Sequence, residues 1–203
     1  MTPNFAPEPI DAPPPAVMIA AVGPAMLRVA AEECDGVKLH GFCTHKYLTG
    51  EIMPRIKAGL AKAGRKRVQY EISGGGFLAT GPDDEAVARR FEWVRQRVAF
   101  YGSTPAYYPV LAVHGLEDLG HKLNALTRQG RWSEMAREVP DDVAHLFAAV
   151  GRHDQIVAAI DRRFGGLIDA LALRGDGAGE VPPGLVQDIR RLPHAFQGFA
   201  RQN

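Results

Sequence analysis

The chain repeatedly places a short apolar run directly before a helical pattern, and this alternation is the feature that most restricts its fold. Val17–Val22 is a continuous apolar run, which suits a strand buried on both faces of a parallel sheet. The pair Gly23-Pro24 then breaks the run, and apolar residues recur at helical spacing up to Cys34, before the turn pair Asp35-Gly36. This first stretch predicts one strand–turn–helix unit.

The next segments repeat the pattern. Val37–Gly41 reads as a strand and His45–Ala63 as a helix, in which Pro54 predicts a kink or a late helix start. Val68–Thr80 is a third strand region. Its three consecutive glycines, Gly74–Gly76, weaken a plain strand and predict a bulge or a close backbone approach.

A long helical region separates the third strand from the last one. It covers about residues 83–163 and is interrupted by Tyr101–Gly120, which is rich in turn residues and aromatics and is typical of a packed loop. Leu167–Leu173 is the fourth strand candidate, and Gly184–Ala200 is a terminal helix that Pro193 breaks. The alternation predicts an α/β fold with right-handed β-α units around a parallel sheet. Four such units fit either a small doubly wound domain or half of an eight-stranded barrel.

Composition excludes several classes of protein. The proline-rich residues 1–16 predict an extended arm before a domain over 17–203. With 24 Lys and Arg against 23 Asp and Glu, and no basic stripe interleaved with aromatics, we expect no nucleic-acid partner. No apolar run approaches the roughly 20 residues that span a bilayer, and the start lacks a basic segment followed by an apolar one. We therefore expect a soluble cytoplasmic protein without a membrane partner.

The two cysteines, Cys34 and Cys43, form no CxxC pair and have no histidine at ligand spacing. The sequence thus predicts neither a disulfide scaffold nor a metal site, which fits a reducing compartment.

The turn after the first strand is a candidate binding site. In a β-α unit, unpaired backbone amides and the positive end of the helix dipole meet at the carboxyl end of the strand. Gly23 presents no side chain there, so a phosphate or another anion is the expected ligand. A Gly-Pro pair can equally serve only to turn the chain and start a helix, and the local sequence leaves both readings open.

Other catalytic signatures are absent from the sequence. It contains no GxxxxGK[ST] loop, no GxGxxG after a strand and no GxSxG elbow. Among its seven histidines, His40 stands out, because it falls at the end of the second predicted strand, at the same edge as the Gly23 turn. A lone histidine at a strand end can also be structural or merely exposed.

A family resemblance emerges from the order of the segments. The segments are AAVGPAMLRVAAEECDG, VKLHGF, MPRIKAGLAKAGR, FYGSTPAYYPVLAVHGLEDLG and LNALTRQGRWSEMAREVPDDV. In this order they resemble the luciferase-like family of flavin and deazaflavin enzymes, and more narrowly its oxidoreductases that use coenzyme F420. The resemblance runs from about residue 1 to 174. Because family members are longer β/α barrels, the chain resembles their carboxyl-terminal portion, with the first four β-α units missing.

The resemblance implies a fold and a site. The four β-α units would be the carboxyl-terminal half of a TIM (β/α)8 barrel, with a helical insertion before the last strand. Phe42, Tyr107 and Tyr108 would line the substrate pocket. The residues implied in cofactor binding are Ala21, Val22, Gly23, Pro24, Ala25, Met26 and His40. A hydride would pass between C5 of the deazaflavin and an organic substrate, with the protein supplying position and electrostatics.

Two alternatives stay open beside an F420 enzyme. FMN can replace F420, because the luciferase-like fold accommodates both cofactors. The chain can also be a non-catalytic fragment, or a half-barrel that needs a partner chain. Four strands of an eight-stranded barrel leave two open edges and an apolar inner face, which favours a homo-oligomer or another association through those edges.

Overall fold

The first predicted unit is present in the structure. The computed structural model describes residues 14–173 and 181–199, in which β1 (Met18–Ala21) leads into α1 (Pro24–Glu33) and then β2 (Gly36–Leu39). Pro24 occupies the first turn of α1, where its missing N–H and fixed φ cost nothing. The helix buries Leu27, Ala30 and Ala31, and the burial of a leucine side chain contributes about 2 kcal/mol to folding.

The helix expected over residues 45–63 begins at His45 but is divided just before Pro54. A short α2 (His45–Tyr47) runs into a π-helical segment, η2 (Leu48–Ile52), and α3 (Met53–Lys62) starts just before Pro54. The π segment lies directly before Pro54, whose ring nitrogen carries no hydrogen to donate within a regular α-helix. α3 packs directly on α1, so closely that a Cβ atom on Gly59 would lie 2.6 Å from Cβ of Ala31.

The third strand region divides at its glycines. After the 3₁₀ turn η3 (Arg67–Gln69), β3 (Glu71–Gly74) ends where Gly74 and Gly75 take φ values of +88° and +91°, and β4 (Phe77–Ala79) follows. A Cβ atom on Gly74 would lie 2.3 Å from the carbonyl oxygen of Leu39, so the backbones approach as closely there as the glycines predicted. At this break the chain leaves the sheet that contains β3 and enters the sheet that contains β4.

Most of the region between residues 83 and 163 is helical. Asp83 caps the long helix α4 (Asp84–Gly102) by accepting a hydrogen bond from the Ala86 amide. The predicted loop 101–120 contains η4 (Pro105–Tyr107) and α5 (Tyr108–Ala112). The elements that follow are α6 (Glu117–Arg128), η5 (Trp132–Glu138) and α7 (Asp141–His145).

Two strand assignments need correction. β5 (Ala148–Val150) lies inside the region expected to be helical and pairs in parallel with β4, before α8 (Ile156–Phe164). The expected strand 167–173 forms only an isolated bridge, between Ala170 and Ser73. The Asp169 side chain explains the difference, because its carboxylate, in place of a backbone carbonyl, accepts the Ile72 amide at 2.7 Å and so interrupts the ladder.

The terminal helix is shorter than predicted. α9 (Pro183–Arg190) ends before Pro193, and the chain then returns to the sheet in extended form. The Gln197 amide donates to the Val68 carbonyl at 2.8 Å, and the Gly166 amide donates to the Pro193 carbonyl at 2.7 Å. Of the predicted proline-rich arm, residues 1–13 lie outside the described part of the chain.

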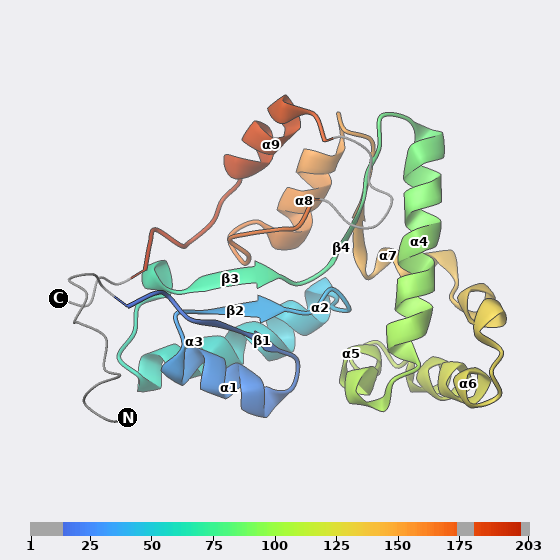
Figure 1. The fold of residues 1–203 in the computed structure, drawn as a ribbon, viewed down its shortest axis with the longest axis horizontal. Helices are drawn as coiled ribbons and strands as arrows, with labels where there is room; N and C mark the ends of the chain where they lie inside the picture. The colour runs from blue at the N-terminus through green and yellow to red at the C-terminus, as the bar shows by residue number, and fades with distance from the viewer. Residues whose placement is uncertain (1–13, 174–180, 200–203) are drawn as a thin grey trace, which may run out of the picture.

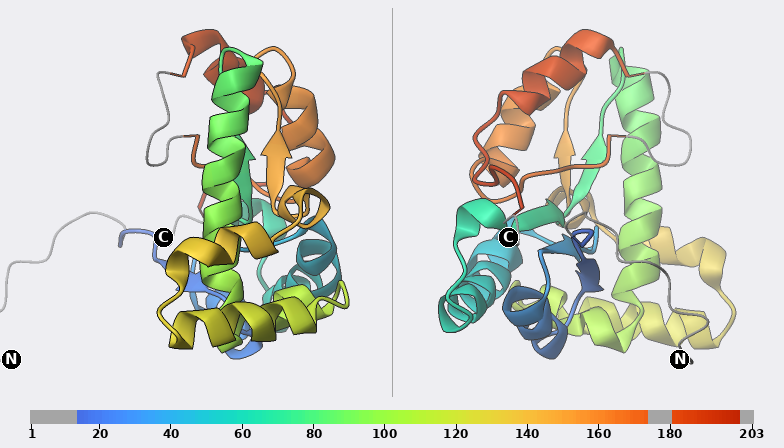
Figure 2. Two further views of the ribbon diagram at one scale, coloured as in Figure 1. Left: turned by 90° about the vertical axis from the view of Figure 1, so that its right-hand side faces the viewer. Right: turned by 60° about the vertical axis from the view of Figure 1, so that its left-hand side comes forward.

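The described elements form layers around two parallel sheets (Figure 1). The first sheet has the order β1-β2-β3, with α1 and α3 packed on one face, whereas α8 and α9 lie beyond its β3 edge. The second sheet, β4-β5, lies between α8 and α4 (Figure 2). One continuous apolar core joins both sheets. Within the described residues, β1 pairs with β2 alone, so its outer edge has no partner strand.

Candidate functional site

The ends of the first three strands define the candidate site. The register pairs Ala21 with Leu39 and Leu39 with Gly74, so all three strands end at one level. Val22 and His40 directly follow the paired residues of β1 and β2. The Gly23 turn and His40 therefore lie at the same edge of the sheet, as the sequence predicted from parallel pairing.

The turn at Gly23 is open. Gly23 has an ordinary extended backbone with φ −86°, and a Cβ atom added to it would meet no atom within 4 Å among the described residues. Its carbonyl accepts the first helical hydrogen bond, from the Leu27 amide at 3.0 Å, and no side chain caps the helix. Pro24, Ala25 and Met26 are exposed. Neither backbone conformation nor packing requires glycine here, so the site has room for a ligand beside uncapped amides.

His40 lies against two tyrosines. Its ring is 4.4 Å from the Tyr101 ring in a T-shaped contact and 4.8 Å from the Tyr107 ring, measured between centroids. Nδ1 of His40 accepts a hydrogen bond from the Phe42 amide at 3.0 Å. The ring is half-buried, and this burial lowers the pKa of His40 below its ordinary value, which favours the neutral imidazole.

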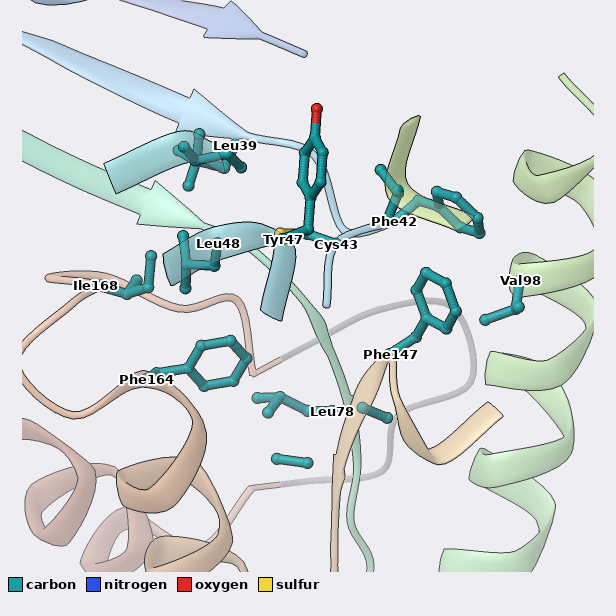
Figure 3. Close-up of a cluster of buried hydrophobic side chains, with 14 of the residues drawn as sticks. Leu39, Phe42, Cys43, Tyr47, Leu48, Leu78, Val98, Phe147, Phe164 and Ile168 are labelled. Atoms are coloured by element: carbon teal, nitrogen blue, oxygen red, sulfur yellow. The ribbon is translucent and has the colours of Figure 1, made fainter. Parts of the chain in front are cut away.

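Phe42 forms part of the wall behind His40. It is only 2% exposed and stacks on Phe147 with a centroid distance of 4.4 Å (Figure 3). It also contacts the Tyr107 ring at 5.6 Å. The structure thus places Phe42 in the core, where it supports the aromatic group formed by His40, Tyr101 and Tyr107.

The two neighbouring tyrosines expected in the substrate pocket, Tyr107 and Tyr108, have different contacts. Tyr107 contacts His40, and burial together with Tyr101 raises the pKa of its phenol. Tyr108 donates its hydroxyl to the Gly120 carbonyl at 3.1 Å and packs on His121. The structure therefore brings Tyr107, His40 and Phe42 together, and directs Tyr108 toward α6.

Several side chains around this edge were not identified from the sequence. Tyr101 comes from the end of α4, and nothing in its local sequence indicates contact with His40. The buried Thr44 caps α2 and bonds His114 Nε2 at 2.8 Å, and Lys46 donates to the Val113 carbonyl. Of these residues, only Thr44 has a recognisable sequence signal, because a threonine directly before a helix is a typical N-cap. These contacts fix the segment after α5 to the start of α2.

Arg163 ties α8 to the same region. Its Nη2 atom donates to the Cys43 carbonyl at 2.9 Å and the Leu146 carbonyl at 2.5 Å. Burial lowers the pKa of Arg163 to about 10, although the nearby Cys43 thiol opposes this. Because carbonyls accept from this guanidinium, it holds the loop after β2 and the entry to β5 at fixed positions.

The described residues offer no group of three or more His, Cys, Asp or Glu that could hold a metal ion. Within the same ranges, no helix is long and apolar enough to cross a membrane. Cys34 and Cys43 are both buried.

The comparison with known proteins decides the family. Residues 1–170 match the family model described as luciferase-like monooxygenase. The chain belongs to the luciferase-like monooxygenase family. An uncharacterized protein of Mycobacterium tuberculosis is 40% identical over 192 residues, which cover 94% of this chain and 56% of that protein. A 5,10-methylenetetrahydromethanopterin reductase of Archaeoglobus fulgidus is 30% identical over 152 residues, or 71% of this chain and 43% of the reductase.

Solved structures agree with the luciferase-like fold. The coenzyme F420-dependent tetrahydromethanopterin reductase of Methanopyrus kandleri superposes with a TM-score of 0.66 at 19% identity, over 88% of this chain and 50% of that one. An F420-dependent secondary alcohol dehydrogenase, solved with an F420-acetone adduct, gives a TM-score of 0.52 at 13% identity, over 76% and 41% of the two chains. The chain thus spans about half the length of the relatives that it matches.

Proposed function

We propose that this chain is an oxidoreductase that uses coenzyme F420 and transfers a hydride between it and an organic substrate. The main observation behind the proposal is that the open Gly23 turn, which follows β1, lies at the same end of the sheet as His40, which follows the neighbouring strand β2. The similarity to a methylenetetrahydromethanopterin reductase supports an oxidoreductase, and the fold shared with two F420-dependent enzymes supports the cofactor.

The residues at this edge fit an anionic cofactor. The turn Ala21–Met26 would hold a cofactor phosphate, because the uncapped amides of Ala25 and Met26 and the positive end of α1 attract an anion. Gly23 leaves the space that a closely bound phosphate needs. His40 would line the pocket, and Tyr101 and Tyr107 would shield its ring from water. When bound, the deazaflavin supplies the hydride donor or acceptor at its C5 atom.

A titration of the purified chain with F420, followed by cofactor fluorescence, tests this proposal. We expect Gly23→Val to weaken binding at least tenfold, since its branched side chain would fill the open space beside the amides. Gly184→Val, in α9 beyond the β3 edge of the sheet, is the matched control, because a Cβ atom there also meets nothing within 4 Å (Figure 1). Equal binding by wild type and Gly23→Val would show that the turn holds no phosphate. Binding of FMN in place of F420 would select the other cofactor.

We also propose that the chain associates through the open edge of β1. The support is the unpaired edge of β1 within the described residues, together with exposed apolar side chains in the adjoining segments: Val17, just before β1, is 53% exposed, and Met26 and Val29 in α1 are 45% and 40% exposed. Sedimentation velocity tests this, with an expected mass of at least two chains. A monodisperse monomer that binds F420 tightly would refute it.

A further inference from the structure

One hydrogen bond fixes the proton on the imidazole of His40. The donor is the backbone N–H of Phe42, 3.0 Å from His40 Nδ1. A backbone N–H can only donate, so Nδ1 must offer its lone pair. In the neutral ring the proton then sits on Nε2. An imidazolium would place two N–H groups against each other and would break this bond.

The groups around the ring also favour the neutral form. Tyr101 from α4 and Tyr107 from η4 are the titratable side chains whose rings contact it. Burial is the one cause that lowers the His40 pKa, and no charged partner contributes to the shift. Among residues 14–173 and 181–199, His40 therefore has no carboxylate to relay a proton to or from, unlike the histidine of a catalytic triad.

The other ring nitrogen is available. The residues that the structure describes provide no hydrogen-bond partner for Nε2. This atom is also not among the fully buried polar side-chain atoms that lack a partner there. The atom thus presents an N–H at the carboxyl edge of β2, with its direction set by the Phe42 amide and the two tyrosines.

We propose that His40 is a positioning residue that donates one fixed Nε2–H hydrogen bond to a carbonyl oxygen of the bound cofactor and carries no proton during the reaction. This role rests on the proposed function for its ligand, but the tautomer itself does not. The proposed role also predicts which ligand atoms His40 prefers: an N–H that is always present binds a hydrogen-bond acceptor and disfavours a donor.

The first test needs no cofactor. Long-range ¹H–¹⁵N NMR of uniformly labelled chain distinguishes protonated from unprotonated ring nitrogens, and the signals lost in His40→Gln assign this residue. We expect protonated Nε2 and bare Nδ1, still mostly neutral at pH 6.5, where an unperturbed histidine is half protonated. A protonated Nδ1, or a cation at that pH, would overturn the proposal.

The second test uses two matched amides. The Gln amide reaches the position of Nε2, whereas the shorter Asn amide reaches only that of Nδ1. F420 titration should give near wild-type affinity for His40→Gln, and a loss of about tenfold, the size of one hydrogen bond, for His40→Asn and His40→Phe. Equal affinities for all variants would refute the bond to the cofactor. If wild type itself binds no F420, the proposed function fails, and the NMR result still decides the tautomer.

Discussion

The Arg67 guanidinium lies 2.9 Å from the carboxylate of Asp169, whose side chain is only 2% exposed, and this pair joins the start of β3 to the segment after α8. The same carboxylate accepts the amides of Ile72, Ala195 and Phe196 at 2.7 to 3.0 Å. One buried side chain therefore holds together the sheet, the expected last strand and the returning terminal segment.

We expect Asp169→Ala to destabilise the fold by about 3 kcal/mol, because it leaves a partly buried arginine and several amides without their acceptor. Urea unfolding followed by circular dichroism measures the change. Asp188→Ala is the control, since it removes only the exposed Asp188–Arg191 pair and should cost less than about 1 kcal/mol. Equal losses for the two variants would contradict the role assigned to Asp169.

The glycines between β3 and β4 provide a second test. Gly74→Ala should cost more than about 2 kcal/mol, because φ is +88° and the new Cβ would lie 2.3 Å from the Leu39 carbonyl oxygen. Gly64→Ala is the matched control. Its φ is also positive, at +66°, but nothing lies within 4 Å of its Cβ, so we expect only the conformational cost of about 1 kcal/mol. If the two variants unfold at the same urea concentration, the close approach at Gly74 does not exist.

Features of the fold with a local cause were predictable. The Gly23-Pro24 turn, the late start of α3 at Pro54 and the break at Gly74–Gly76 each follow from what one residue type does to the backbone. β5 was not predictable, because its three residues are too few for a period and helices flank them.

Only the part of the site that lies directly after the ends of β1 and β2 was predictable from the sequence. His40 and the turn share an edge because parallel strands end together. The contact of His40 with Tyr101 joins residues far apart in sequence, and the Asp169 carboxylate replaces a backbone acceptor. Neither relationship leaves a pattern in the local sequence, so both required the structure.

Two histidines should make stability depend on pH. Burial lowers the pKa of His40, and burial followed by the charges of Lys46 and Arg163 lowers that of His114. The unfolded chain therefore binds protons near pH 6.5 that the folded chain does not, so stability should fall as pH drops below this value. Urea midpoints between pH 7.5 and 5.5 measure the effect, above the range where most carboxylates titrate. The double variant His40→Gln, His114→Gln should lose less stability over this range, and an unchanged pH dependence would contradict the assignment.

Both thiols should be inert in the folded protein. Cys43 is 2% exposed, and burial raises its pKa to about 12 against the opposing charge of Arg163. Burial also raises the pKa of Cys34. Because the thiolate is the reactive form, a chromogenic disulfide reagent at pH 8 should modify the native chain more than about a hundredfold slower than the chain in urea. Cys34→Ser leaves Cys43 as the single reporter. Rapid labelling of that variant would mean that the loop after β2 opens, and with it the edge that carries His40.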